Sequence, residues 1–179
     1  MAARGRWGKV GRVLGGIALM LAFVAVVGGV LVSRAGRWGV PYFSFTSAHG
    51  SHCTNNLTGY TCSPLTLADV EFFGDVRLPE DTTVGASTYR ATHDFALDAR
   101  LEVPRASAAA ASKQLRSAYG RCQKDAASPL VTAGLRDVCA MVNPDGAEAD
   151  GQLSSRVYAV GTGLRRDGTL VVAMSVRSR

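Results

Sequence analysis

The chain has 179 residues and a formal net charge of +6, with a pI near 9.5, and this length suits one domain plus an appendage. The charge is uneven, because residues 1–41 hold six Lys and Arg and no acid, whereas residues 42–179 hold 14 basic and 14 acidic residues. The larger part of the chain is therefore neutral, which argues against nucleic-acid binding.

An uninterrupted apolar run follows the basic N-terminus. Residues 13–32 contain no charged or strongly polar side chain, and as a helix they span about 30 Å, the thickness of a bilayer core. We therefore predict a transmembrane helix over 13–32, preceded by a basic tail at 1–12. Trp7 and Trp38 bracket the run, where aromatic belts lie. The alternative is a signal peptide that is cleaved near Ala35.

The basic residues around this run predict its orientation. Four Lys and Arg side chains precede it and two follow it. Positive charge favours the cytoplasmic side, so we expect a single-pass protein of the cell membrane with a cytoplasmic N-terminus and the rest of the chain outside. The lipid bilayer is then the first expected partner.

Small residues form a stripe along one face of the same helix: Gly15, Ala18, Ala22, Ala25 and Gly29. Such a stripe allows close approach of another helix in lipid, so it predicts self-association or pairing with a partner helix. The alternative is a chance stripe in a segment rich in Gly and Ala.

The chain contains four cysteines. In an oxidising extracytoplasmic compartment they predict two disulfides, and we favour Cys53 with Cys62 and Cys122 with Cys139, because each pair closes a short, turn-rich loop. Each such loop contributes about 3 kcal/mol of stability in the chain-entropy model.

A zinc site is the alternative for the segment 47–63. His49 and His52 with Cys53 and Cys62 have the right ligand types. The spacing matches no standard zinc finger, however, and the cysteines would have to be reduced. We therefore predict no metal and no cofactor.

Residues 33–52 mix Gly, Ser and aromatic residues without periodicity and are predicted as a juxtamembrane linker. The domain at 53–179 is then expected to contain helices and strands with clear signals. The predicted elements are a helix at 66–73, strands at 82–90 and 95–103, a helix at 107–119, a second helical stretch at 128–142, and strands at 155–163 and 169–177. Asp167-Gly168 suits a type I′ turn between the last two strands, and the acidic segment 144–153 is predicted as a mobile loop.

This order of elements predicts the fold class. We expect a small α+β domain of two layers, in which an antiparallel sheet of about four strands carries helices on one face.

Motifs that would indicate enzymatic chemistry are missing from the sequence. It contains no phosphate loop, dinucleotide fingerprint, nucleophile elbow or zincin helix. His93 could act as the base of a triad, but the adjacent Asp94 is expected to point to the opposite face of a strand. Asp98 and Glu102 could form a carboxylate pair on an exposed face, but Arg100 lies between them. We therefore predict no catalytic residues and no enzymatic activity.

The run "LTLADVEFFGDVRLPEDT…YRATHDFALDARLEVP", followed by an Ala-rich helix ending "YGRC", covers about residues 65–122. It resembles uncharacterised secreted or membrane-anchored proteins of high-GC Gram-positive bacteria such as streptomycetes. The resemblance implies the location and the domain class, and it implies no activity. We expect an envelope protein whose outer domain binds a protein or another envelope ligand. A secreted inhibitor or toxin-like factor, released near Ala35, is the alternative.

Overall fold

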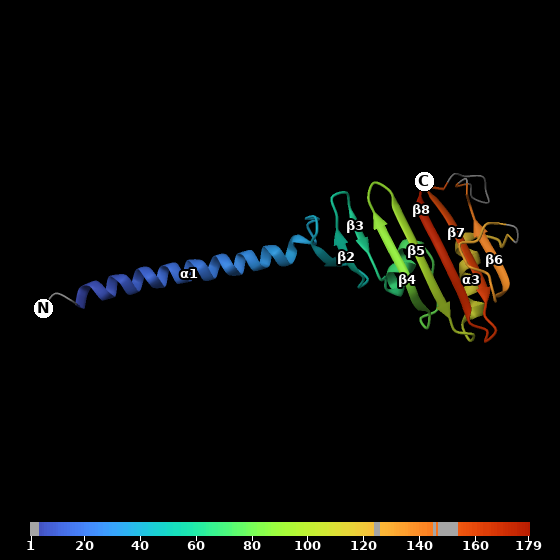
Figure 1. Ribbon diagram of the computed structural model, residues 1–179, viewed down its shortest axis with the longest axis horizontal. Coiled ribbons are helices and arrows are strands. Elements are labelled where there is room, and N and C mark those ends of the chain that lie inside the picture. The colour runs from blue at the N-terminus through green and yellow to red at the C-terminus, as the bar shows by residue number, and fades with distance from the viewer. Residues whose placement is uncertain (1–3, 124–125, 145, 147–153) are drawn as a thin grey trace.

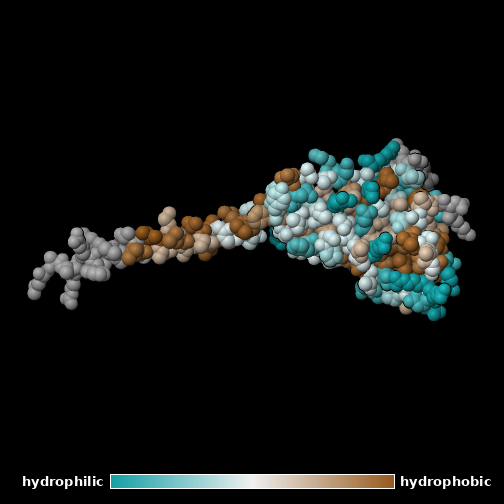
Figure 2. Space-filling model, viewed as in Figure 1, coloured by the Kyte–Doolittle hydropathy of each residue, from teal (hydrophilic) through white to brown (hydrophobic). Residues whose placement is uncertain are grey.

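The structure is a computed structural model that describes residues 4–123, 126–144, 146 and 154–179. Helix α1 (Arg4–Ala35) projects from one end of a domain that contains the rest of the chain (Figure 1). Its segment Leu14–Ala35 has 22 residues and is long and apolar enough to cross a membrane. The large apolar side chains of this segment are exposed (Figure 2). The predicted apolar N-terminal helix is therefore confirmed.

The chain is ordered where α1 meets the domain. Gly36 lies so close to strand β1 (Ser44–Thr46) that a side chain at this position would collide with the carbonyl oxygen of Ser44. Strand β1 pairs with β2 (His52–Asn55). The predicted linker at 33–52 thus contains a strand of the sheet. The sequence did not indicate this strand, because a short strand held by its neighbour needs no periodic pattern. The domain begins before residue 53.

One eight-stranded sheet forms the domain, in the order β1-β2-β3-β4-β5-β8-β7-β6. All neighbouring strands are antiparallel. The remaining strands are β3 (Tyr60–Cys62), β4 (Thr83–Ala91), β5 (Phe95–Val103), β6 (Arg136–Val142), β7 (Arg156–Leu164) and β8 (Leu170–Ser178). The antiparallel sheet is confirmed, but the predicted number of about four strands is wrong. Strands β1 to β3 have three or four residues each, too few for a readable alternation.

The strands with the clearest alternation form the centre of the sheet. In β5, Leu97 and Leu101 are fully buried whereas Arg100 and Glu102 are exposed. Leu101 pairs with Val172 of β8, which is also fully buried. The buried face of these strands forms the core of the domain.

Two short helices cover this buried face. Val70 of α2 (Leu67–Gly74) and Leu115 of α3 (Ala108–Tyr119) are fully buried. The hydroxyl of Tyr119, at the end of α3, donates a 2.6 Å hydrogen bond to the carbonyl oxygen of Gly74, at the end of α2. Both helices predicted at 66–73 and 107–119 are confirmed, although helices are a minor part of the domain.

Residues 128–142 do not form the predicted second helix. Residues 136–142 are the edge strand β6, which pairs with β7. The preceding residues cross the face opposite to the helices, where Leu130 packs over Gly161 of β7. Leu135 packs beside Gly163 of β7, whereas Val131 is exposed. The hydrogen bonds that β7 supplies to β6 are not visible in local periodicity.

Two predicted loops have different outcomes. Strands β7 and β8 form the predicted hairpin, in which Leu164 pairs with Leu170. Of Asp167 and Gly168 only Gly168 has a positive φ angle, so the turn is not of type I′, which needs two such residues. The predicted mobile loop at 144–153 lies outside the described residues, apart from Pro144 and Gly146.

Candidate ligand-binding cleft

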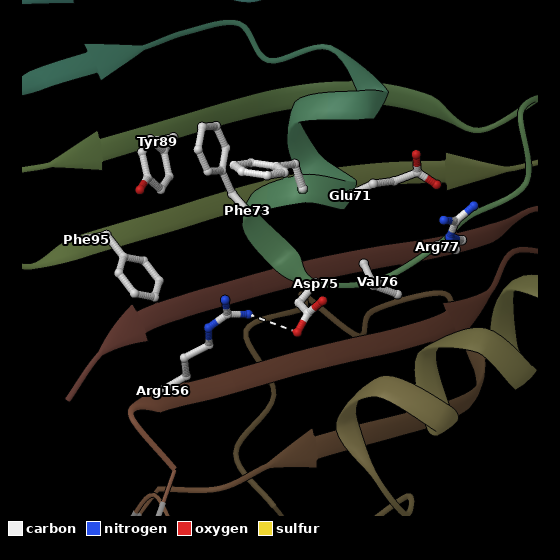
Figure 3. A pocket seen from close by; sticks show the side chains of 9 residues that line it. Glu71, Phe73, Asp75, Val76, Arg77, Tyr89, Phe95 and Arg156 are labelled. Atoms are coloured by element: carbon white, nitrogen blue, oxygen red, sulfur yellow. Dashed lines mark ion pairs between the residues drawn. The ribbon is translucent and has the colours of Figure 1, made fainter. Parts of the chain in front are cut away.

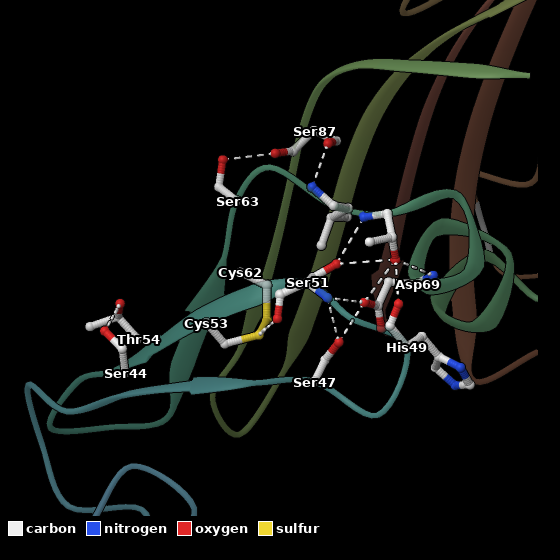
Figure 4. Close-up of a disulfide and its surroundings, with 12 residues drawn as sticks. Ser44, Ser47, His49, Ser51, Cys53, Thr54, Cys62, Ser63, Asp69 and Ser87 are labelled. Carbon is white, nitrogen blue, oxygen red and sulfur yellow. Dashed lines mark hydrogen bonds between the residues drawn. A yellow bond between two sulfur atoms is a disulfide. The ribbon is translucent and has the colours of Figure 1, made fainter. Parts of the chain in front are cut away.

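Helix α2 is held at its start by a buried polar network (Figure 4). The hydroxyl of Thr66 caps the helix and accepts a hydrogen bond from the backbone amide of Asp69. The Asp69 carboxylate accepts hydrogen bonds from the Ser47 hydroxyl (2.5 Å) and the Ser51 amide (3.0 Å). Burial tends to raise the pKa of Asp69, but the hydrogen bonds from its serine and threonine neighbours lower that pKa below its usual value. The network thus ties the loop at 47–51 to α2.

Aromatic rings form a row beside α2, on the face of the sheet that carries the helices: Phe45, Tyr60, Phe73, Tyr89 and Phe95. At its centre, Phe73 lies flat on Tyr89, with ring centroids 3.6 Å apart and planes at 6°. The centroids of Tyr60 and Phe95 lie 6.0 and 6.3 Å from that of Tyr89. Four strands and one helix supply the five rings, so strand pairing assembles the row.

A cleft of about 510 Å³ opens beside this row (Figure 3). Figure 3 shows Phe73, Tyr89 and Phe95 gathered at one end, with Glu71 and Arg77 at the other. The lining residues are Glu71, Phe72, Phe73, Asp75, Val76, Arg77, Tyr89, Phe95 and Arg156. The cleft therefore combines ring surfaces with charges of both signs.

Arg156 forms one wall of the cleft. Its guanidinium Nη1 lies 3.4 Å from Oδ2 of Asp75, and both side chains are partly exposed. Its Cζ atom lies 5.9 Å from the centroid of the Phe95 ring, within the range of a cation–π contact. Arg156 is held between this ring and this carboxylate, and it is positioned to contact a ligand together with either of them.

The phenol of Tyr89 is a poor proton donor near neutral pH. Burial, together with the neighbouring Tyr60, raises the pKa of Tyr89 to about 12, so the phenol stays protonated. The Oε1 atom of Glu71 accepts a 2.7 Å hydrogen bond from the backbone amide of Leu78. The lining contains no histidine, serine, cysteine or lysine. The lining therefore offers ring surfaces and charged groups for contact with a ligand.

The structure joins the four cysteines as Cys53 with Cys62 and Cys122 with Cys139. Cys53 and Cys62 face each other across β2 and β3 and are fully buried (Figure 4). The second bridge ties the chain after α3 to the edge strand β6. Sulfur atoms in a disulfide are not available as thiolate ligands. Across the described part of the chain, no group of three or more His, Cys, Asp or Glu residues could hold a metal ion.

The three histidines lie apart from one another. The ring of His49 packs against Phe72, with centroids 4.9 Å apart. His52 is exposed on β2, and His93 is exposed in the turn before β5. None of the three histidines lines the cleft.

The carboxylates of β5 lie on the face opposite to the cleft and have basic neighbours. Glu102 accepts two hydrogen bonds from the guanidinium of Arg165, one of them 2.8 Å long. Asp98 lies 4.0 Å from Arg177. The carboxylates of β5 therefore form surface ion pairs.

The small residues of α1 are exposed along the helix. Gly15, Ala18, Ala22, Ala25 and Gly29 are exposed on the helix, and no other part of the described chain lies within 4 Å of a Cβ built at Gly15 or Gly29. Association through this stripe stays a prediction.

No local pattern in the sequence indicates the aromatic row or the role of Arg156. No protein-family model matches the chain, and no curated protein and no solved structure matches it significantly. The geometry of the cleft and the placement of the apolar helix therefore carry the functional argument.

Proposed function

We propose that this chain is a single-pass membrane protein whose outer domain binds a partner molecule in the aromatic cleft. Residues 1–12 lie in the cytoplasm, residues 13–32 cross the bilayer, and the domain lies outside the cell. The observation that carries this proposal is an exposed apolar helix of 22 residues joined directly to a domain with two disulfides. Disulfides persist in oxidising compartments, and the basic N-terminal tail favours the cytoplasm.

The junction after α1 joins the helix to the domain without a spacer. The carbonyl oxygen of Gly36, one residue past the proposed cleavage position, accepts a 2.6 Å hydrogen bond from the buried side chain of Asn55. Ala35 is buried as well. In the folded protein the peptide bond after Ala35 is therefore part of the domain.

The cleft supports binding as the role of the outer domain. Aromatic rings and arginine, which line the cleft, are enriched at the core of protein interfaces. The exposed ring of Phe72 extends this surface towards solvent. A protein segment or another envelope ligand with an apolar group beside a charge fits this lining, and the proposal includes no catalytic step and no nucleic acid.

Cell fractionation and cysteine labelling test the location. We expect full-length protein in washed membranes, and we expect a membrane-impermeant maleimide to label a cysteine added at the C-terminus but not one added at the N-terminus. A shortened species in the medium would instead support the secreted alternative.

Photo-crosslinking in intact cells tests the cleft. A photoreactive amino acid in place of Phe72 is expected to yield a discrete adduct. The matched control replaces Val131, which is similarly exposed but lies outside the cleft. Equal adducts from both positions, or none from Phe72, contradict binding in the cleft.

A further inference from the structure

We infer that the base of the outer domain is seated in the headgroup region of the outer leaflet. The base consists of Trp38, Val40, Tyr42 and Phe43, which expose aromatic or apolar surface between α1 and β1. The inference rests on the membrane anchor proposed above. It adds that the domain, and not only the helix, contacts lipid.

The base follows directly after the segment that spans the membrane. At 1.5 Å per residue the segment Leu14–Ala35 spans about 33 Å, slightly more than the roughly 30 Å hydrocarbon core. The backbone amides of Trp38 and Val40 donate hydrogen bonds of 3.2 and 3.1 Å to the carbonyl oxygen of Ala35. The base is thus held at the end of the span, at the level of the headgroups, a layer about 5–8 Å thick in each leaflet.

The exposed side chains of the base are of the types that occur at membrane interfaces. Trp38 and Tyr42 are 62% and 76% exposed, and tryptophan and tyrosine are the residues that membrane interfaces favour. Arg34 and Arg37 lie beside them and are also exposed. Guanidinium groups hydrogen-bond to phosphate, so the surroundings of the base match the headgroups of lipids.

The part of the domain next to the base carries no charged side chain. The sequence contains no Lys, Arg, Asp or Glu between Arg37 and Asp69. This stretch includes β1, β2 and β3, which lie at the end of the sheet next to α1 (Figure 1). Moving a charged group out of water is costly. The part of the domain nearest the membrane therefore has the lowest desolvation cost when it approaches lipid.

The base cannot move independently of the sheet. The backbone amide of Tyr42 donates a 2.9 Å hydrogen bond to Asn55, whose own amide donates a 3.0 Å bond to Phe43. A base bound to lipid would therefore fix the angle between the sheet and the membrane.

Tryptophan fluorescence of the full-length chain tests the inference. Because Trp7 and Trp38 are the only tryptophans, Trp7→Phe leaves Trp38 as the single reporter. The protein is reconstituted into vesicles of phosphatidylethanolamine and phosphatidylglycerol with acyl chains brominated near the glycerol. We expect Trp38 to be quenched by the brominated lipid and protected from iodide. Adding the neutral polar substitution Tyr42→Asn should increase iodide quenching, and asparagine tolerates the positive φ angle at this position.

A matched control combines Trp7→Phe and Trp38→Phe with Val131→Trp, at a side chain that is 70% exposed and far from α1 in the sequence. We expect its emission at longer wavelength, with strong quenching by iodide. If Trp38 behaves like this control while the protein still floats with vesicles after carbonate washing, the inference is overturned and the anchor stands. Failure to float overturns both. Shielding of Trp38 from both quenchers that disappears on dilution with lipid would identify a second copy as the occupant and also overturn the inference.

Discussion

The side-chain amide of Asn55 donates a 2.6 Å hydrogen bond to the carbonyl oxygen of Gly36, and both residues are buried. This bond links the first residue after α1 to the end of β2. It joins the end of the helix directly to the sheet.

Replacing Asn55 tests this link. Asn55→Ala leaves the Gly36 carbonyl buried without its donor, so we expect the free energy of unfolding to fall by about 1–3 kcal/mol. Denaturant titration of the full-length chain in detergent measures this change. His52→Ala, at an exposed position of the same strand, should stay within about 0.5 kcal/mol of the parent. Equal effects of the two substitutions would contradict the role given to Asn55.

Asp69 should make the domain sensitive to acid. Its pKa in the folded state is below the usual value, so the unfolded chain takes up a proton first as the pH falls. The stability that Asp69 contributes is present above about pH 4 and is lost as the pH falls below that value. Asp69→Asn should lower stability at pH 7 by about 1–2 kcal/mol and flatten its decline in acid. Melting curves from pH 7 to pH 3 measure both effects, and an unchanged acid slope would refute the assignment.

Arg156 allows binding to be separated from folding. Its pair with Asp75 is partly exposed, and such pairs contribute about 0–1 kcal/mol to stability. Arg156→Ala should therefore leave the melting temperature nearly unchanged while removing the adduct formed from position 72. Arg100→Ala, on the opposite face of the sheet, is the matched control and should retain the adduct. Loss of the adduct in both variants would show that the cleft is not the site.

Gly161 should report on the segment that crosses the open face of the sheet. A Cβ there would lie 2.8 Å from Cβ of Leu130 and would collide with the hydroxyl of Ser128. Gly161→Val should displace this segment and lower the free energy of unfolding by about 1–3 kcal/mol. Val131→Ala, at an exposed neighbour, should change it by less than about 0.5 kcal/mol. Hydrogen exchange of residues 128–135 would show whether the segment is released, and unchanged protection would refute the packing argument.

The elements that were predictable from sequence are those in which one local pattern decides the structure. The alternation of Leu97 with Arg100 and Glu102 indicates a half-buried strand, and Thr66 with Asp69 marks the start of α2. Even there Asp69 differs from a capping-box acid, because it bonds to Ser47 and Ser51 rather than to the amide of Thr66. The local pattern placed the helix, while the tertiary partner of its acid was not visible.

The aromatic row could not be predicted because it exists only after strands have paired. Tyr60 approaches Tyr89 since β3 pairs with β4, and Phe73 reaches Tyr89 from a helix. Each ring looks like an ordinary core residue in its own segment. The only sequence signal for the row was the number of aromatic residues at inward positions. Which rings meet depends on the strand register, and short strands such as β3 do not encode that register.

Strand β8, the last of the described strands along the chain, lies in the interior of the sheet. Strand β8 pairs on one side with β5 and on the other with β7, so the meander from β1 to β5 and the β6–β7 pair stay two separate halves until residues 170–178 arrive. The sheet is therefore incomplete until residues 170–178 have paired with both halves. A chain truncated after the β7–β8 turn would leave β5 and β7 with unpaired edges, which are exposed to proteolysis and aggregation.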